Sequence, residues 1–370
     1  MDTTDARWAW VALALVPSMG WNARRYHDVL AVGAPAELFR ASRRALAEKV
    51  GDDLATSIKG FDAPGAIAGQ RAAAERAEAR LVILEDADYP PALKTAPLPP
   101  PFLIVRGTLA REDALSVAVV GSRRPTGYGL RTAERLAGDL AGRGVTVVSG
   151  FARGVDTAAH RGALDAGGRT LAVLGSGVDV VYPSENRPLV RAIAAAGAVI
   201  SQFPMGTAPL PQHFPIRNRV IAGLALGTVV VEAAERSGAL ITARHAGELG
   251  REVYAVPGNV SSATSEGANR LIQDGAKLVR DWEDVVAEWP AVWRAALRPT
   301  SPAAATRVAA AGGTTGAEGR LLPLLGEEPV AIDDVIDKSG LPAGDVAASL
   351  MTLELRGLVR QLPGQRYVRR

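Results

Sequence analysis

Five glycine-bearing turns between residues 121 and 259 carry the residue types that could bind phosphate groups. Their sequences are GSRRPTGYG from Gly121, SGFARGVD from Ser149, GSGVDVVYP from Gly175, EAAERSGALIT from Glu232 and PGN from Pro257. Each turn follows a short β-branched segment and precedes a helical one. Backbone N–H groups in such turns, and helix N-termini, favour anions. The pattern therefore predicts an anion-binding surface.

The first turn offers a phosphate group several donors and two cations. They are the backbone N–H groups from Gly121, the Ser122 hydroxyl and the guanidinium groups of Arg123 and Arg124. A dinucleotide site needs Gly-x-Gly-x-x-Gly and an acidic residue that ends the second strand, and a Walker loop needs Gly-Lys-Ser/Thr. This turn fits neither pattern, so it favours phosphate binding without a metal ion. A tight strand–helix turn without a ligand is the alternative.

The second and third turns extend the predicted anion site. We predict contacts with the ligand from Gly150, Ala152 and Gly154 in SGFARGVD, and from Gly175 and Ser176 in GSGVDVVYP. Glycine lets the backbone approach a ligand closely. Tyr182, near the end of the third turn, is interpreted as a packing residue rather than a stacking one.

Catalytic chemistry is not indicated by these turns. Asp156 lies near a helix start, where a carboxylate caps N–H groups. His160 is interpreted as a surface or packing residue. Glu232 and Asp156 lie on separate turns without an evident partner, and the four histidines show no metal-ligand spacing. We therefore predict no catalytic residue, no metal ion and no cofactor.

The stretch HFPIRNRVIAGLA is the most specific of these motifs. Phe214 precedes Arg217, Asn218 and Arg219 at the head of an apolar helix. Single-stranded nucleic acid needs such an arrangement, because an aromatic ring stacks on a base while cations bind phosphates. The alternative makes Phe214 a helix staple and Arg217 a structural ion-pair partner. A further helix start at Ser237-Gly238 adds another anion-receptive N-terminus.

The elements that must position these turns alternate between strand and helix. Apolar, β-branched runs predict buried strands over 116–120, 145–149, 170–174, 198–201, 228–231 and 252–256, with a short one over 277–280. Units of roughly 25–30 residues are typical of βαβ crossovers. The sequence therefore predicts an α/β, Rossmann-like parallel sheet. All strand C-termini would share one edge, the rim, where ligands bind.

Four regions follow from the composition along the chain. Residues 1–80 show helical periodicity and predict a small bundle, with a helix-hairpin-helix module as the alternative. Residues 81–288 form the Rossmann-like domain, which we expect to fold alone, and its first part is a proline-rich connector. Residues 289–318 predict a flexible linker. Residues 319–370 have the layout of a winged helix, with a long helix over 343–356 and a hairpin turn at Pro363-Gly364.

Overall composition adds only mild constraints. Net charge is +3, and only five of the 42 basic residues are lysine, which suits phosphate binding but also fits codon usage in a GC-rich genome. The absence of cysteine excludes disulfides and fits a reducing cytosol. The apolar run over residues 8–17 is too short to span a bilayer and has the wrong charge for a signal peptide. We therefore predict a cytoplasmic protein without a membrane partner.

Six motifs, in this order, resemble the bacterial DNA-processing protein A family (DprA, also called Smf). They are GSRRPTGYG, SGFARGVDTAAHRGAL, GSGVDVVYPSEN, FPIRNRVIAGL, VVVEAAERSGALITARHAGELGREVYAVPG and SEGANRLIQDGA. The resemblance spans roughly residues 80–285. It implies a homodimer that binds and protects incoming single-stranded DNA and loads the RecA recombinase during natural transformation. Sterile-alpha-motif-like N-terminal domains and winged helices accompany many members.

The resemblance also assigns roles to residues. Gly121, Ser122 and Arg123 would cradle a backbone phosphate, Phe214 would stack on a base, and Arg217 and Asn218 would support that pocket. Some members carry a lysine shortly before the aromatic residue, whereas this chain reads Pro-Leu-Pro-Gln-His from residue 209. Another basic group must then replace that lysine, or binding is weaker.

Two alternatives concern other functions. A nucleotide-binding hydrolase of the phosphoribohydrolase type would resemble a Pro-Gly-Gly-x-Gly-Thr loop with nearby glutamates, and this chain has no such loop. In the winged helix, the long helix carries few residues that read base edges. Arginines gather instead at the wing, so we expect an accessory contact there; they are Arg356, Arg360, Arg366, Arg369 and Arg370.

Overall fold

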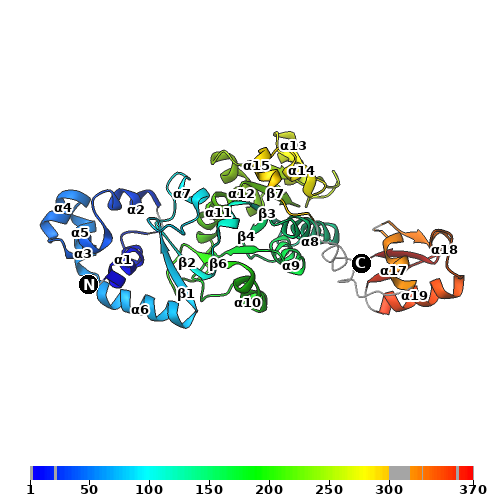
Figure 1. Cartoon of the computed structure of the whole chain (residues 1–370), viewed down its shortest axis with the longest axis horizontal. Coiled ribbons are helices and arrows are strands. Elements are labelled where there is room, and N and C mark those ends of the chain that lie inside the picture. Colours follow the sequence, from blue (N-terminus) through cyan, green and yellow to red (C-terminus); the bar gives the residue numbers. More distant parts are fainter. Residues whose placement is uncertain (1–2, 21–22, 300–316, 327, 356–357, 370) are drawn as a thin grey trace. The chain divides into compact units, whose positions relative to one another are not determined.

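The computed structural model describes residues 3–20, 23–299, 317–326, 328–355 and 358–369 (Figure 1). The chain divides into two compact units, Met1–Thr300 and Ser301–Arg370. Among the helices in these described ranges, none has the length and apolar character needed to cross a membrane. Of the predicted linker, residues 300–316 lie outside the described residues, as do Arg356 and Arg370.

The first unit is built on one nine-stranded sheet in the order β1-β2-β6-β5-β4-β3-β7-β8-β9. Seven strands are parallel, as predicted: β3 (Ser116–Gly121), β4 (Thr146–Ser149), β5 (Thr170–Val173), β6 (Ala198–Ser201), β7 (Gly227–Val231), β8 (Glu252–Ala255) and β9 (Lys277–Leu278). The expected connector adds two antiparallel strands at one edge, β1 (Ala79–Ile83) and β2 (Phe102–Gly107). The mostly parallel α/β sheet is therefore confirmed.

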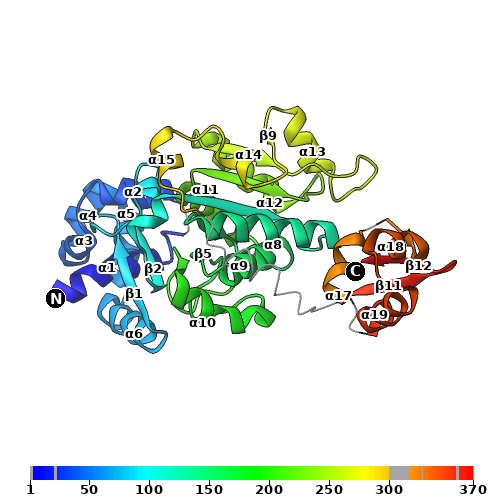
Figure 2. The same cartoon turned by 45° about the vertical axis from the view of Figure 1, so that its right-hand side comes forward.

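Helices cover both faces of the sheet (Figures 1 and 2). Three lie on one face: α8 (Gly127–Gly142), α9 (Val155–Asp165) and α10 (Arg187–Ala196). Two lie on the other: α11 (His213–Leu224) and α12 (Gly238–Glu248). Strand β3 shows why both faces of the sheet are covered by helices. Its Val117 and Val119 pack with α8 and α9, whereas Ala118 and Val120 pack with α11 and α12. Successive side chains of a strand point to opposite faces, so an unbroken apolar run supports both helical layers.

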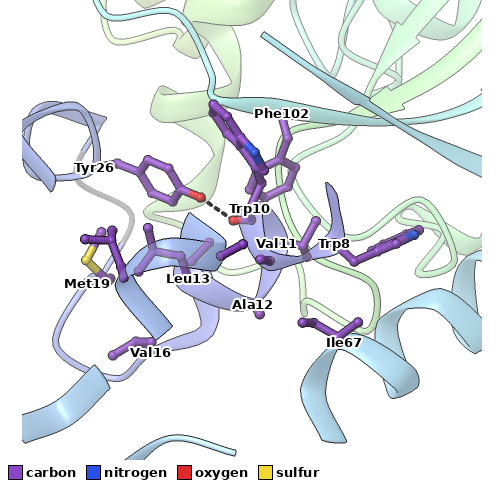
Figure 3. Packing of buried hydrophobic residues seen from close by; sticks show 14 of the residues in the cluster. Trp8, Trp10, Val11, Ala12, Leu13, Val16, Met19, Tyr26, Ile67 and Phe102 are labelled. Atoms are coloured by element: carbon purple, nitrogen blue, oxygen red, sulfur yellow. Dashed lines mark hydrogen bonds between the residues drawn. The ribbon is translucent and has the colours of Figure 1, made fainter. Parts of the chain in front are cut away.

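The N-terminal helices share their hydrophobic core with the sheet. They are α1 (Thr3–Leu15), α2 (Ala23–Leu30), α3 (Pro35–Arg40), α4 (Arg43–Val50), α5 (Asp52–Gly60) and α6 (Ala63–Arg76), followed after β1 by α7 (Pro91–Lys94). Trp8 and Leu13 of α1 belong to the same buried cluster as Phe102 and Ile104 of β2 (Figure 3). The helical region and the sheet edge therefore stabilise each other, and the expectation that residues 81–288 fold alone does not fit this shared core.

The start of the predicted linker is ordered against the sheet. After α13 (Glu266–Gln273) and α14 (Trp282–Val286), a short helix α15 (Ala291–Ala295) follows. Trp289 is only 4% exposed and its ring meets that of Trp293 edge to face. The Arg298 backbone N–H donates to the Arg143 carbonyl at 2.9 Å. The buried Trp289 ring and this hydrogen bond hold residues 289–299 on the first unit, so the start of the predicted flexible linker is ordered.

The second unit is a winged helix, as predicted (Figure 2). Its helices are α17 (Ala317–Leu321), α18 (Ile332–Ser339) and α19 (Ala343–Leu355). Its strands β10 (Val330–Ala331), β12 (Arg366–Arg369) and β11 (Val359–Leu362) form a small sheet in that order. Leu322, Val335, Leu350 and Tyr367 belong to a hydrophobic cluster confined to this unit.

The two ends of the chain should respond differently to truncation. We expect a chain that ends at residue 299 to keep the stability of the first unit, because the winged helix has its own core. Its affinity for a rim ligand should stay within about tenfold, or 1.4 kcal/mol, of the full chain. A chain that starts at residue 79 should be insoluble, because Phe102 and Ile104 lose the apolar partners that cover them. Expression and thermal melts of both truncations check this, and a soluble, cooperative second truncation would contradict it.

Candidate nucleic-acid interface

The rim of the sheet holds a groove of about 730 Å³ between the turns after β3, β4 and β7 and the start of α11. A smaller cavity adjoins it and shares Arg123, Ala152, Tyr182, Phe214 and Arg217 with it. Between them they are lined by thirteen predicted site residues: Gly121, Ser122, Arg123, Arg124, Gly150, Ala152, Gly175, Ser176, Phe214, Arg217, Asn218, Ser237 and Gly238. We call both together the rim groove. The position agrees with the rule that ligands bind where the strand order of an open sheet reverses.

The first turn presents its donors beside a helix end that is already capped. Thr126 caps α8 by accepting the Gly129 N–H at 3.2 Å. The Glu232 carboxylate accepts the Thr126 N–H at 2.8 Å and also the Thr126 hydroxyl. A carboxylate therefore occupies the N-terminus of α8, where an anionic ligand would otherwise bind. The Arg124 N–H donates to the Ser122 hydroxyl oxygen at 3.1 Å. The donors left for a ligand are the Ser122 hydroxyl and the side chains of Arg123 and Arg124, which are both exposed.

Phe214 lies over the backbone of the third turn. A Cβ atom on Gly175 would stand 2.9 Å from Cδ1 of Phe214, so only glycine leaves room for the ring. The guanidinium carbons of Arg123 and Arg217 lie 5.2 and 5.7 Å from the ring centroid, within the range of cation–π attraction. The Tyr182 ring lies 6.0 Å away and is 42% exposed. The ring of Phe214 is partly exposed and lines the groove, so it is not a buried staple.

Arg217 fastens the second and third turns together. Arg217 is only 4% exposed. Its side chain donates to the carbonyls of Gly150 and Val173, the latter at 2.5 Å, and to Oδ1 of Asn218 at 3.1 Å. Burial lowers the pKa of Arg217 to about 10, despite the opposing effect of Asp156. These contacts give Arg217 a supporting role beneath the groove.

Asp156 and Asn218 complete this support. Asp156 is 6% exposed and accepts the Ala152 N–H at 3.2 Å. Ala152 lies in the turn before α9, so this carboxylate stabilises the turn and does not cap N–H groups of the helix, as the sequence had suggested. Burial raises its pKa, while Arg217 acts in the opposite direction. Asn218 donates to the Gly238 carbonyl at 3.2 Å, and so links α11 to the start of α12. The side chains under the groove thus hold its turns in place.

Two predicted site residues lie apart from the groove. Arg219 donates to the Pro97 carbonyl at 2.6 Å and lines a separate cavity beside the proline-rich connector. Gly154 packs behind the first turn with a positive φ of 75°, where a Cβ atom would stand 2.4 Å from the Ser122 carbonyl oxygen. Neither faces the rim groove with the other thirteen residues.

His160 is a packing residue and not a surface one. Its ring is fully buried, and Nδ1 lies 2.7 Å from the Thr170 hydroxyl oxygen. That hydroxyl donates its single hydrogen to the Val147 carbonyl, so Nδ1 of His160 must be the donor. Burial lowers the pKa of His160 to about 3, which keeps the ring neutral. In the described ranges, no group of three or more histidine and carboxylate side chains could hold a metal ion.

Fold and groove together define a Rossmann-like protein whose sheet rim carries a groove lined by glycine-bearing turns and arginines. The chain belongs to the DNA recombination-mediator protein A family, whose sequence model matches residues 80–290. A second model, the DprA winged helix domain, matches residues 300–365.

Known relatives agree with this assignment. DNA processing protein DprA of Streptococcus pneumoniae is 45% identical over 207 residues, which cover 56% of this chain and 73% of that protein. Protein Smf of Synechocystis is 37% identical over 77% of this chain and 79% of its own length. The X-ray structure of the S. pneumoniae protein matches with a TM-score of 0.66 at 34% identity, over 78% of this chain and 99% of that one. The Helicobacter pylori protein matches with a TM-score of 0.51 at 28% identity, over 56% and 94%.

Proposed function

We propose that this chain binds single-stranded DNA in the rim groove and acts as a recombination mediator during natural transformation. The observation that carries the proposal is the partly exposed Phe214 ring, seated on Gly175 beside two guanidinium groups. A ring can stack on any base, and the exposed Arg123 guanidinium beside it can bind an adjoining phosphate, whereas Arg217 supports the turns beneath the ring. The H. pylori relative is a protein whose solved structure was described for its single-stranded DNA binding mode.

The wider role that we propose follows family membership. The protein protects the incoming strand and loads the RecA recombinase onto it in the cytoplasm, without catalysing a reaction. It acts as a homodimer, which places two rim grooves in one assembly, so that a strand crossing both gains from high effective concentration. The winged helix supplies an accessory contact.

A nucleotide hydrolase is not favoured by the geometry of the rim. Its two candidate carboxylates, Asp156 and Glu232, are 6% and 4% exposed and accept hydrogen bonds from Ala152 and Thr126. Both therefore stabilise turns and are poorly placed to act as an acid or a base. Incubation of the protein with nucleoside monophosphates should release no free base.

A salt-dependent gel shift tests the proposal. We expect single-stranded oligonucleotides to bind more tightly than blunt duplex, with little dependence on base sequence. Affinity should fall steeply as salt rises, because bound phosphates release counterions. Equal or tighter binding to duplex across the salt range would contradict the proposal.

A further inference from the structure

A second groove, of about 600 Å³, lies between α6 and α10 and gathers four arginines. Arg76 comes from the end of α6, Arg106 from β2, and Arg187 and Arg191 from α10. The other lining residues are mainly small or apolar: Ala73, Ala77, Val178, Asp179, Val181, Pro188 and Val190. We call this surface the basic groove.

The charge of the basic groove is largely uncompensated. Asp179, the single acidic residue among its lining side chains, accepts the Gly206 N–H with both oxygens, at 2.9 and 3.1 Å. Arg106 pairs with the exposed Glu78 at 2.7 Å. Within the part of the chain that the structure describes, the side chains of Arg76, Arg187 and Arg191 form no hydrogen bond or ion pair. Three guanidinium groups therefore remain available to an anionic ligand.

Two of these arginines stand where they destabilise their own helix. Arg187 is the first residue of α10, whose first turn contains no acidic residue. The partial positive charge of a helix N-terminus disfavours a cation there. Arg191 follows four residues later, so the two like charges are neighbours on the helix surface. An anionic ligand would offset both effects.

The basic groove adjoins the rim groove through one shared loop, residues 175–183. Gly175, Ser176 and Tyr182 of this loop line the rim groove, whereas Val178 and Val181 line the basic groove. The exposed Tyr182 directly follows Val181 of the basic groove in the sequence, and its ring lies 6.0 Å from the ring of Phe214 in the rim groove.

The wall between the two grooves is held by hydrogen bonds. The Gln70 side chain of α6 accepts the Met205 N–H at 2.8 Å and donates to the Met205 carbonyl at 3.1 Å. The Gly177 N–H donates to the Thr207 carbonyl at 3.0 Å. The loop and α6 are therefore fixed to the same segment after β6, so the groove is already formed without a ligand.

We propose that the basic groove binds the sugar–phosphate backbone of single-stranded DNA that leaves the rim groove past Tyr182. The proposal rests on the proposed function of the rim groove. Guanidinium groups bind phosphate oxygens in paired hydrogen bonds, and the small apolar lining contains no base-edge readers. The basic groove would lengthen the binding site without adding sequence preference, and would supply cations that the segment before Phe214 lacks.

The test compares Arg187→Ala/Arg191→Ala with the full-length wild type on an oligothymidylate series of increasing length. The shortest strands should bind both proteins alike, because they reach only the rim groove. On long strands the variant should bind more weakly. The slope of log affinity against log salt concentration, which we call the salt slope, should be less steep by about 1.4, since each lost phosphate contact contributes about 0.7 on single strands. The matched control is Arg43→Ala/Arg44→Ala, which removes two exposed arginines from α4 and changes net charge equally.

Three results would overturn the proposal. They are an equal loss in the control variant, an equal loss on the shortest strands, and unchanged affinity and salt dependence on long strands. The rim groove is judged separately, by Phe214→Ala on the shortest strands. If that variant binds normally while the basic-groove variant is weakened on long strands, the proposed function of the rim fails, and the basic groove binds single-stranded DNA by itself rather than as an extension of the rim.

Discussion

Replacing Arg217 with methionine is expected to lower the free energy of unfolding of the first unit by about 3–5 kcal/mol, as removal of one partner from a buried charge pair does. The substitution leaves the carbonyls of Gly150 and Val173 without their donor and leaves Asp156 buried with only the weaker influence of Arg123 as a positive charge. Single-strand binding should be lost with it, because the turns under Phe214 are no longer held together. Urea unfolding followed by tryptophan fluorescence measures the change. All six tryptophans lie before residue 300, so the signal reports on the first unit alone.

The pH dependence of this penalty distinguishes a buried charge from simple loss of packing. Burial already raises the pKa of Asp156 in the folded protein, and Arg217 opposes that effect. Without Arg217, the folded-state pKa of Asp156 rises further above its unfolded value. The variant therefore retains its stability at acidic pH, where Asp156 is protonated, and loses it as pH rises through the raised pKa of Asp156. A penalty that is independent of pH would contradict the charge-pair explanation.

Two variants serve as controls for Arg217→Met. Arg219→Ala removes the neighbouring arginine of the same helix, whose hydrogen bond to Pro97 is partly exposed. Arg219→Ala should lower the free energy of unfolding by no more than about 1.5 kcal/mol, which is typical of one hydrogen bond. Asp156→Asn combined with Arg217→Met should recover part of the lost stability, because no uncompensated charge remains. If the double variant is no better than the single one, Asp156 is not the cause of the penalty.

Much of the rim could be predicted because strand–turn–helix units place strand ends at one edge whatever the surrounding packing. That rule alone brought together Ser122, Gly150 and Gly175, which are far apart in the sequence. Helix geometry separates Arg219 from Arg217, since residues two positions apart point to nearly opposite sides of a helix. Their closeness in the sequence suggested that Arg217 and Arg219 belong to one cluster. Counting the helical angle from Phe214 would have assigned Arg219 to another surface.

Pairings between distant residues could not be predicted from local patterns. Glu232 caps the turn at Thr126 across 106 positions, and only the parallel pairing of β3 with β7 brings them together. The shared core of Trp8 with Phe102 likewise depends on which face of β2 the helices cover. Neither feature follows from periodicity, because periodicity gives the buried side of an element and not its partner.

Substitution of Phe214 with alanine is expected to weaken single-strand binding by about 1–3 kcal/mol for one stacked base and to leave the salt slope unchanged. Arg123→Ala should instead make the slope less steep by about 0.7, because it removes one phosphate contact. The two residues are also neighbours, with the Arg123 guanidinium carbon 5.2 Å from the ring centroid. Their double variant should therefore lose less than the sum of the single losses. Binding of one short oligonucleotide to the four proteins, over a range of salt concentrations, gives all three quantities.

A thermal melt shows whether Phe214 acts by stacking on a base or by packing in the hydrophobic core. Phe214 is partly exposed, so its removal should cost little stability, whereas Phe203 is fully buried against the His213 ring at 4.6 Å. Phe203→Ala should cost about 3–5 kcal/mol, as buried aromatic truncations do. Tryptophan at position 214 should bind as tightly as wild type, because a larger ring stacks at least as well. If Phe214→Ala instead melts as early as Phe203→Ala, or lowers the salt slope as Arg123→Ala does, the ring is not a stacking platform.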